Sequence, residues 1–225
     1  PLAGAAWLLD SDATGLRRSV EAKQGPIRMA WRPREYGDPA PDPPAYDDGD
    51  FRMLDPGDDP RPPVGALDRS FSYTAVITTD AGEIILELLD DLSPMAVENF
   101  INLSRIGFYD GLEFHLVIPG VRSQVGKPLI DGIDGPGYTF NDEFDRELSH
   151  NAPGVVSMAN SGSNTNGSQF FITHDSARWM DAFDEGVAKN CADDADSCHS
   201  IFGRVTEGIE VVTSMEERDP VASPA

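Results

Sequence analysis

The chain has 225 residues, a hydrophobic content of 40% and a formal net charge of −22, from 39 acidic and 17 basic residues. This hydrophobic content is ordinary for a globular protein and excludes wholesale disorder, and the length suffices for one packed domain with an appendage. The acidity argues against nucleic acid as a partner, because the phosphate backbone repels a negatively charged surface.

The sequence contains no apolar run long enough to span a membrane. It begins at Pro1 rather than at a methionine, which leaves room for an upstream signal or tether beyond this sequence. An acidic composition suits a secreted, periplasmic or salt-exposed protein. We therefore expect an extracytoplasmic protein, periplasmic or secreted, with no membrane span in this chain.

Residues 1–70 are predicted to form a proline-rich N-terminal extension, since they hold 11 of the 18 prolines. A short helix is predicted over Leu8 to Val20 and a short strand over Pro26 to Trp31, whereas residues 39–63 are too rich in proline for either. Two interpretations stay open: a flexible linker, or a docking arm that binds a larger protein assembly. The aromatic anchors of such an arm are Trp7, Trp31, Tyr36 and Tyr46.

Regular patterns begin at Phe71, the start of the predicted domain 71–225. Apolar residues alternate on both sides of a turn at Asp80 to Gly82 and predict an antiparallel hairpin. Ser93 and Pro94 then open a helix, with serine as its N-cap, and Gly107 closes it. The later elements predicted are strands over 112–118, up to 124, over 155–158, 170–172 and 201–205, and a helix over 207–217. Many short strands with two helices favour an antiparallel barrel with helices over its ends.

The stretch from Gly154 to Thr173 is predicted to be a strand, a polar loop and a second strand. The loop, residues 160–167, consists of small and amide residues that tolerate unusual backbone angles. It is too polar for the core, yet it offers solvent little charge. Backbone groups and amides beside aromatic rings suit a site for an uncharged polypeptide.

The two cysteines, Cys191 and Cys198, bracket a short acidic stretch. A local disulfide is the first interpretation, and it favours an oxidising compartment. A zinc site that also uses His199 is a weak alternative, because the spacing matches no standard pattern. A calcium site is also weak, because a calcium loop's glycine and ligand spacing are missing. Its ligands would be Asp193, Asp194 and Asp196. We therefore expect no metal and no cofactor.

Six ordered motifs together carry a resemblance to a known family. They are Phe114-His115-x-Val-Ile-Pro-Gly120, Gly135-Pro-Gly-Tyr138, Ser157-Met-Ala-Asn160, Asn164-Thr-Asn-Gly-Ser-Gln-Phe-Phe171, Trp179-Met-Asp181 and Ile201-Phe-Gly-Arg204. Across about 71–220 the chain resembles the cyclophilin family of peptidyl-prolyl cis-trans isomerases. The resemblance implies a mainly β fold, a closed antiparallel eight-stranded barrel capped by two helices, with a proline pocket on its outer face. It also implies a rotamase for proline-containing polypeptides that acts in protein folding without metal or cofactor.

The resemblance assigns most of a peptide-binding pocket to this chain. The matching positions are Gln124, Ala159, Asn160, Gln169, Phe171, Trp179, Met180 and His199. Phe171 and Met180 would form the socket for the proline ring, with Trp179 and His199 at its rim. The Asn160 backbone and the Gln124 amide would orient the flanking peptide through hydrogen bonds.

The chain departs from the family pattern at the residue that carries catalysis. Leu116 stands where the family has an arginine that donates to the prolyl nitrogen in the transition state. Val121 replaces an aromatic residue, and Arg122 replaces a methionine. Leu116 and Arg122 flank the turn at Pro119-Gly120, so we expect them to face each other, which makes Arg122 a candidate substitute donor with partial effect. The chain is expected to be an isomerase with reduced activity; the alternative is a non-catalytic cyclophilin-fold subunit of a larger extracytoplasmic complex.

Further departures concern the frame of the pocket. Residues 182–198 form an insertion, either a surface decoration or an element that covers the pocket or binds a partner. The chain also stops where the family adds a final strand, so we expect either truncation or a substitute such as Ile27 to Trp31. His150 and His174 are interpreted as loop or surface residues.

Overall fold

The computed structural model describes residues 9–12, 15–21, 27–33, 53–128, 134–192 and 197–218. Within them the strands are β1 (Leu9–Asp12), β2 (Gly15–Glu21), β3 (Ile27–Pro33), β4 (Phe71–Thr79), β5 (Gly82–Leu88), β6 (Leu116–Ile118), β7 (Arg122–Val125), β8 (Val155–Met158), β9 (Phe170–Thr173), β10 (Phe183–Asp184), β11 (Val187–Ala188) and β12 (Ile201–Glu207). The helices are α1 (Pro94–Arg105), the short 3₁₀ helix η1 (Arg178–Met180) and α2 (Ile209–Thr213). None of these helices has both the length and the apolar character that crossing a membrane requires.

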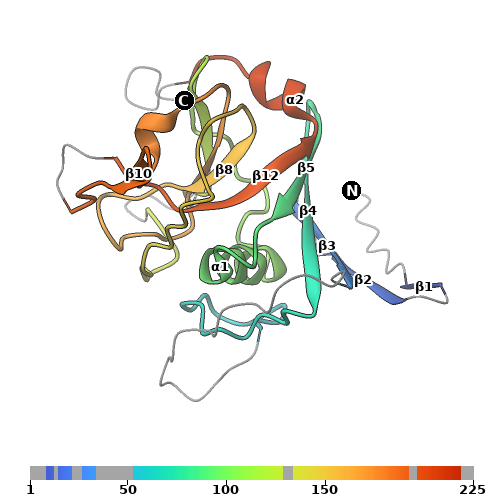
Figure 1. Ribbon diagram of the computed structural model, residues 1–225. Coiled ribbons are helices and arrows are strands. Elements are labelled where there is room, and N and C mark those ends of the chain that lie inside the picture. The colour runs from blue at the N-terminus through green and yellow to red at the C-terminus, as the bar shows by residue number, and fades with distance from the viewer. Residues whose placement is uncertain are drawn as a thin grey trace.

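One antiparallel sheet contains most of the described strands, in the order β1-β2-β3-β4-β5-β12-β8-β9-β7-β6, while β10 and β11 form a separate hairpin (Figure 1). The predicted mainly β fold with two helices is confirmed. The order is linear rather than circular, because no strand pairing among the described residues joins β1 to β6. The backbone around the candidate site therefore comes from one end of the sheet, where β8, β9, β7 and β6 lie side by side.

The helix predicted over residues 8–20 is wrong, because β1 and β2 form an antiparallel hairpin there. Gly15 would cost a helix interior about 1 kcal/mol relative to alanine, and the strand β3 offers β2 a ladder of backbone partners instead. The strand predicted over residues 26–31 is confirmed. It pairs with β4 from Ile27–Ile77 to Pro33–Phe71. The N-terminal extension thus covers the β4 edge, as the substitute-strand alternative requires.

Residues 53–67 have neither helix nor strand and run along α1 (Figure 1). Their attachment is specific: the Leu54 N–H donates to Asn102 Oδ1 at 2.7 Å, and the Val64 N–H donates to Glu98 Oε1 at 2.7 Å. Both apolar side chains are buried, and burial raises the pKa of the Glu98 carboxyl. The described end of the extension is therefore a packed part of the domain and not a flexible linker. Trp7, Tyr36 and Tyr46 lie outside the described residues.

The helix α1 begins at Pro94 as predicted, but its N-terminal N–H groups find a different partner. Ser93 makes no side-chain cap, and its hydroxyl donates to the Ile201 carbonyl. The Glu143 carboxylate instead accepts from the N–H groups of Met95 at 3.0 Å and Ala96 at 2.8 Å. A carboxylate suits this position because the helix dipole is positive at its N-terminus.

Two predicted elements are shorter than expected. The strand predicted over 112–118 begins only at Leu116, because the chain turns before it, with Leu112 N–H bonded to the Tyr109 carbonyl. The helix predicted over 207–217 is confined to α2 and starts after Gly208, whose φ is +84°. A side chain on Gly208 would collide with the Glu83 carbonyl, so the break between β12 and α2 requires glycine.

Candidate functional site

The candidate pocket is built on a row of residues that crosses four adjacent strands. Leu116 pairs with Gln124, Gln124 with Phe171, and Phe171 with Ser157. Directly opposite residues in an antiparallel sheet point to the same face, so these four side chains share one face. The row places the candidate socket residue Phe171 two strands away from Leu116, with Gln124 between them.

Phe170 and Phe171 divide between the two faces of β9, as alternation predicts. Phe170 lies in the main core, with T-shaped contacts to Phe100, Tyr109 and Phe202. Phe171 belongs to a separate cluster with Ala177 and Met180, against which Val121 and Ala159 pack. The predicted socket pair Phe171 and Met180 is thus brought together.

Gln124 and Gln169 are joined by a hydrogen bond from Gln124 Nε2 to Gln169 Oε1 at 2.9 Å. Gln169 in turn donates to the Asp134 carbonyl at 2.7 Å, and its own carbonyl accepts from the Ala159 N–H at 2.9 Å. The Gln124 Oε1 atom is buried without a hydrogen-bond partner. These residues line a cavity of about 600 Å³ together with Asn160.

Arg122 lies over the socket. Its guanidinium carbon is 5.0 Å from the centroid of the Phe171 ring, a cation–π distance. The register pairs Arg122 with Ile118, whereas Leu116 pairs with Gln124. The expectation that Leu116 and Arg122 face each other directly is therefore wrong, and they are diagonal neighbours on one face. The Arg122 Nε atom is buried without a partner, and burial lowers the pKa of this guanidinium.

The rim residues differ in exposure. Trp179 is 58% exposed, while His199 is buried, with its ring 5.0 Å from the Phe171 ring in a T-shaped contact. His199 Nδ1 donates to the Met158 carbonyl at 2.9 Å, which leaves Nε2 to accept from the Ser197 hydroxyl at 2.8 Å. Burial lowers the pKa of His199 to about 4, and the charge of Arg122 acts in the same direction. The histidine is therefore neutral at physiological pH.

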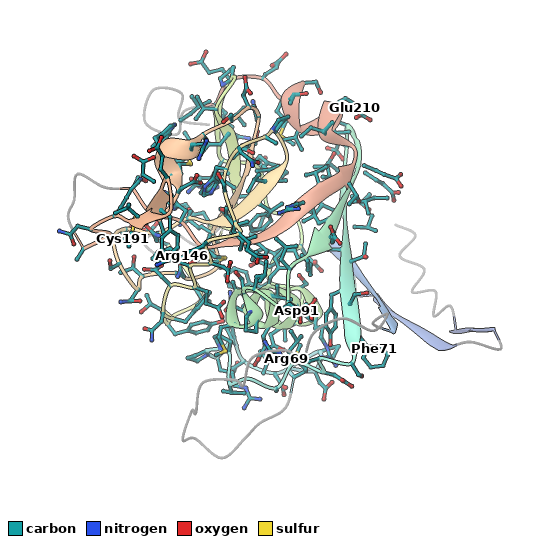
Figure 2. All side chains as sticks on the ribbon, viewed as in Figure 1. Arg69, Phe71, Asp91, Arg146, Cys191 and Glu210 are labelled. Atoms are coloured by element: carbon teal, nitrogen blue, oxygen red, sulfur yellow. A yellow bond between two sulfur atoms is a disulfide. The ribbon has the colours of Figure 1, made fainter. Side chains whose placement is uncertain are left out.

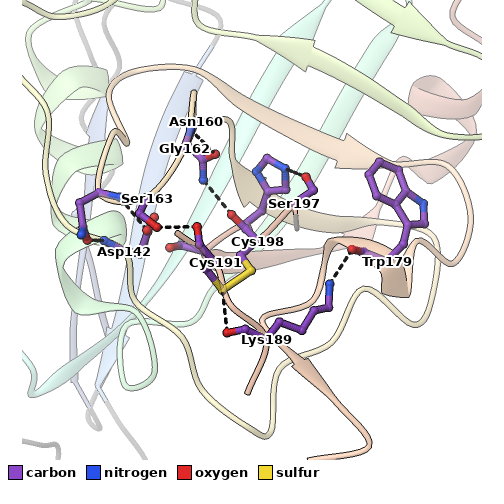
Figure 3. Close-up of a disulfide and its surroundings, with 12 residues drawn as sticks. Asp142, Asn160, Gly162, Ser163, Trp179, Lys189, Cys191, Ser197 and Cys198 are labelled. Atoms are coloured by element: carbon purple, nitrogen blue, oxygen red, sulfur yellow. Dashed lines mark hydrogen bonds between the residues drawn. A yellow bond between two sulfur atoms is a disulfide. The ribbon is translucent and has the colours of Figure 1, made fainter. Parts of the chain in front are cut away.

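The predicted disulfide between Cys191 and Cys198 is confirmed, and it takes both sulfurs away from the zinc alternative (Figure 3). The Cys198 carbonyl accepts from Asn160 Nδ2 at 2.8 Å, and the Cys191 carbonyl accepts from the Ser163 hydroxyl at 2.6 Å. Asp193, Asp194 and Asp196 lie outside the described residues. Within the described part of the chain, no three His, Cys, Asp or Glu residues lie close enough together to hold a metal ion.

His150 and His174 lie in loops, as predicted, but both are buried and neither is a surface residue. His174 Nδ1 accepts from the Gly120 N–H, and its Nε2 is 2.8 Å from the Ser123 hydroxyl. The ring therefore ties the turn after β6 to β7. Interpretation as a surface residue failed because a histidine in a loop gives no sequence signal of the groups that it meets in space.

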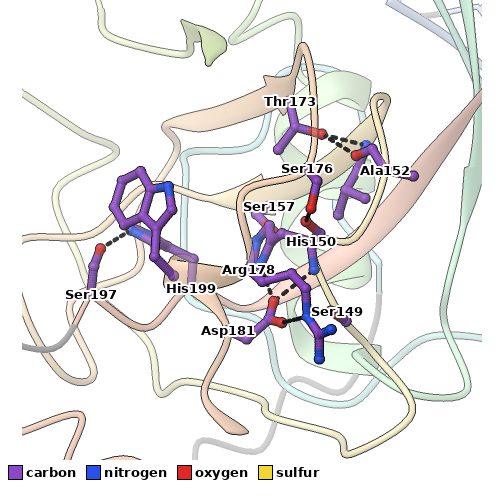
Figure 4. Close-up of polar contacts among 12 residues, drawn as sticks. Ser149, His150, Ala152, Ser157, Thr173, Ser176, Arg178, Asp181, Ser197 and His199 are labelled. Atoms are coloured by element: carbon purple, nitrogen blue, oxygen red, sulfur yellow. Dashed lines mark hydrogen bonds and ion pairs between the residues drawn. The ribbon is translucent and has the colours of Figure 1, made fainter. Parts of the chain in front are cut away.

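Ser157, His150 and Asp181 form a buried hydrogen-bonded relay (Figure 4). His150 Nδ1 is 2.7 Å from Asp181 Oδ1, and His150 Nε2 is 2.7 Å from the Ser157 hydroxyl. The His150 ring also stacks on Phe171 at 6.0 Å. Because Ser157 and His150 are fully buried, no substrate can reach this hydroxyl, and the relay supports Phe171 instead of acting as a nucleophile. Asp181 is 31 residues away from His150 in the chain, which is why the sequence did not reveal the relay.

Comparison with known proteins decides the family. A family profile described as "Cyclophilin type peptidyl-prolyl cis-trans isomerase/CLD" matches residues 74–224. The chain belongs to this family. Its relatives include the peptidyl-prolyl cis-trans isomerase cyp15 of Rhizopus delemar, 46% identical over 146 residues, which are 64% of this chain and 21% of that protein. The peptidyl-prolyl cis-trans isomerase cypE of Dictyostelium discoideum is 41% identical over 63% of this chain and 83% of that protein.

Several cyclophilin-type relatives are much longer proteins. The peptidylprolyl isomerase domain and WD repeat-containing protein 1 of Homo sapiens is 43% identical over 144 residues, and the match covers only 20% of it. The chain thus spans about a fifth of the length of most of the curated relatives named. Among solved structures, a cyclophilin-type isomerase of Cryptosporidium parvum matches with a TM-score of 0.52 and 32% identity, over 65% of this chain and 88% of that one. The same protein was also crystallised in the presence of the dipeptide Ala-Pro.

Proposed function

We propose that this cyclophilin binds proline-containing polypeptide segments and isomerises their prolyl bonds slowly, with Arg122 as the donor to the prolyl nitrogen. The observation that carries the proposal is the guanidinium of Arg122 over the ring of Phe171, with a buried and unused Nε atom. A cation held above the floor of an apolar socket is what stabilisation of a twisted prolyl bond needs.

The chemistry requires positioning more than bond making. Rotation about the imide bond faces a barrier of roughly 18–20 kcal/mol that comes from amide resonance, and no nucleophile or metal is needed to lower it. Phe171 and Met180 are fully buried in this structure, and they form the apolar floor for a proline ring that enters when the Arg122 guanidinium moves aside from the Phe171 ring. The unused Gln124 Oε1 and the Asn160 backbone orient the flanking peptide, so that the bond is held part-way along its rotation.

The position of Arg122, the proposed hydrogen-bond donor to the prolyl nitrogen, explains why isomerisation would be slow. As the bond twists, the prolyl nitrogen becomes pyramidal and accepts a hydrogen bond that is strongest in the transition state. Loss of one such donor costs about 3–4 kcal/mol, or several hundredfold in rate. Arg122 reaches the socket from a diagonal position, not from Leu116 on β6. Because a guanidinium is directional, we expect it to restore only part of this stabilisation.

The disulfide at the pocket supports a location outside the cytoplasm. The disulfide between Cys191 and Cys198 lies at the pocket and favours an oxidising compartment. We therefore propose that this chain is periplasmic or secreted.

A second candidate function is a non-catalytic subunit of a larger extracytoplasmic complex, with partner contacts made by the N-terminal extension. It is favoured by the long relatives, one of which carries WD repeats.

A titration with a short Ala-Pro peptide, followed by NMR, separates the two functions. Chemical-shift changes report binding, and exchange between the cis and trans peaks reports turnover. The proposal expects binding in the millimolar to micromolar range with slow but measurable exchange, and no binding of a control peptide with alanine in place of proline. Binding without any added exchange supports the non-catalytic subunit. Absence of binding contradicts a proline site altogether.

A further inference from the structure

The helix α1 carries two buried asparagines that bind different parts of the molecule. Every residue from Met95 to Ser104 is buried, and side chains surround the helix in Figure 2. Asn102 accepts from the Leu54 N–H and so fixes the N-terminal extension. Asn99, about one turn earlier, binds the loops around the cavity of about 600 Å³. Because a buried polar side chain costs stability unless it is hydrogen-bonded, the partners of each asparagine indicate its role.

Asn99 joins two loops that line this cavity. Its Nδ2 donates to the Gly167 carbonyl at 2.8 Å, and its Oδ1 accepts from the Tyr138 hydroxyl at 2.7 Å. Gly167 belongs to the loop that leads into β9, Tyr138 belongs to the loop 134–139, and both residues line the cavity. Asn99 is fully buried and is not among the described residues of the cavity lining. It therefore acts on a bound peptide only through these loops.

Both hydrogen bonds of Asn99 have a fixed direction. The Gly167 carbonyl can only accept, so the amide nitrogen of Asn99 must face it. Burial raises the pKa of the Tyr138 hydroxyl, and Glu98 acts in the same direction, so this hydroxyl keeps its proton and donates to the remaining Oδ1. The two loops also touch, since a Cβ on Gly167 would lie 3.2 Å from Pro136 Cδ. A shift of one loop therefore displaces the other.

The backbone held by Asn99 leads directly to the amide pair at the cavity. Gln169 follows Gly167 by two residues, and its Oε1 accepts from Gln124 Nε2 at 2.9 Å. Gln169 and Gln124 line the same cavity. Because only one residue separates Gly167 from Gln169, loss of the bond to Asn99 would move this amide pair as well as the cavity wall.

We propose that Asn99 is a positioning residue for the bound polypeptide: through Tyr138 and Gly167 it sets the shape of the cavity that receives a residue beside the proline. Such support of a binding site by buried hydrogen bonds limits the movement of the groups that contact the ligand. The inference deepens the proposed function and rests on it, because a flanking residue enters the cavity only when a proline lies over Phe171. Asn99 should therefore affect the binding of long peptides, and not the rate at which a bound prolyl bond rotates.

Two peptides of different length test this role by NMR titration and exchange. One is a blocked Ala-Pro dipeptide, and the other is the same dipeptide extended by two alanines at each end. We expect the long peptide to bind the unaltered chain about tenfold more tightly. In Asn99→Ala and in Tyr138→Phe its dissociation constant should rise about fivefold, which corresponds to the loss of one hydrogen bond. The dissociation constant of the dipeptide and the exchange rate per bound peptide should stay unchanged.

The outcomes separate this inference from the proposed function. If neither peptide binds the unaltered chain, the proposed function fails, and the role of Asn99 fails with it. If both peptides bind with equal affinity, or if the long peptide binds both variants as tightly as the unaltered chain, the role of Asn99 alone is overturned. A slower exchange of the bound dipeptide in Tyr138→Phe would also overturn it, because the effect would then reach the socket.

Asn102→Ala is the matched control for stability. It also removes a buried amide from α1 and leaves a backbone group unpaired, but its partner is Leu54 in the N-terminal extension. We expect a similar decrease of the denaturation midpoint in Asn99→Ala and Asn102→Ala, with tight binding of the long peptide kept only in Asn102→Ala. Equal losses of affinity in both would assign the effect to lower stability and overturn the positioning role. Tyr138→Phe removes one hydroxyl and keeps the test decisive if Asn99→Ala does not fold.

Discussion

Arg122 reaches Phe171 diagonally: the guanidinium carbon lies 5.0 Å from the ring centroid, although the strand register pairs Arg122 with Thr173 and Phe171 with Gln124. The Arg122 guanidinium therefore lies over the socket, although its backbone is not directly opposite Phe171 in the sheet. Leu116, which pairs with Gln124, lies in the same row as Phe171. An arginine introduced at position 116 would approach the socket from the end of that row. Its effect on the isomerisation rate can therefore be compared with that of the native Arg122.

Replacing Leu116 by arginine is expected to speed the isomerisation. The Leu116→Arg side chain would extend along the face that carries Gln124 and Phe171, and would supply a hydrogen-bond donor from the row itself. We expect a rate increase on the order of one hundredfold in NMR exchange on an Ala-Pro peptide. The control is Ile118→Arg, which places an arginine on the same strand face opposite Arg122. If both variants isomerise the peptide equally fast, the added positive charge explains the higher rate, and the position of Leu116 in the row with Gln124 and Phe171 does not.

The fold of this region could be predicted from the sequence because its signals are local. The alternation of Phe170 and Phe171 and the spacing of the two cysteines depend on neighbours in the chain. The diagonal reach of Arg122 depends on a register that one residue of slip would change. The relay of Ser157, His150 and Asp181 depends on one strand and two loops, and the loop that carries Asp181 meets the other two residues only in the folded protein. Local signals could not reveal it.

Asp181 is expected to be a large contributor to stability. Its Oδ1 accepts from the backbone N–H and the ring of His150, and its Oδ2 accepts from the Ser149 hydroxyl at 2.6 Å (Figure 4). In Asp181→Asn an amide NH₂ replaces one acceptor and leaves buried donors unpaired. We expect the free energy of unfolding to fall by about 3 kcal/mol in denaturant titration. Asp184→Asn, at an exposed position on β10, is the control. A loss below about 0.5 kcal/mol would show that the relay contributes little.

Stability should fall below neutral pH because of His199. Its pKa is lowered to about 4 in the folded protein, chiefly by burial, from an ordinary 6.5 when unfolded. The unfolded state therefore binds more protons between these values, and the stability present above pH 6.5 is lost as the pH falls toward 4. Burial raises the pKa of Glu143 to about 7, which works in the opposite direction, so a single pH curve is not decisive.

The contribution of His199 is the difference between two such curves. Between pH 7 and pH 4 the unaltered chain is expected to lose about 3 kcal/mol more unfolding free energy than the His199→Gln variant. Glu143 and the buried His150 are present in both proteins and cancel. Parallel curves would mean that His199 takes up its proton in the folded pocket without cost.

The β4 edge is covered by β3, so trimming the N-terminus should promote self-association most when β3 itself is removed. Deletion of residues 1–26 removes β1 and β2 and keeps the pairing from Ile27–Ile77 to Pro33–Phe71. Deletion of residues 1–52 also removes β3 and exposes the backbone groups of β4, while the segment packed on α1 remains. The first deletion uncovers the positions of β3 that pair with β2, from Arg28 to Trp31, whereas the second uncovers the longer ladder of β4, from Phe71 to Ile77. We therefore expect stronger self-association of the shorter protein, measured by light scattering after gel filtration. A monomeric 53–225 chain would show that β4 needs no cover.

The most direct test of slow catalysis by Arg122 is prolyl exchange in matched arginine variants. Arg122→Ala removes the cation over Phe171, whereas Arg146→Ala removes an exposed arginine that lies over the Phe183 ring outside the socket. The exchange rate per bound Ala-Pro peptide is expected to fall at least tenfold in Arg122→Ala and to stay unchanged in Arg146→Ala. Equal rates in Arg122→Ala and the unaltered chain would remove Arg122 from the mechanism.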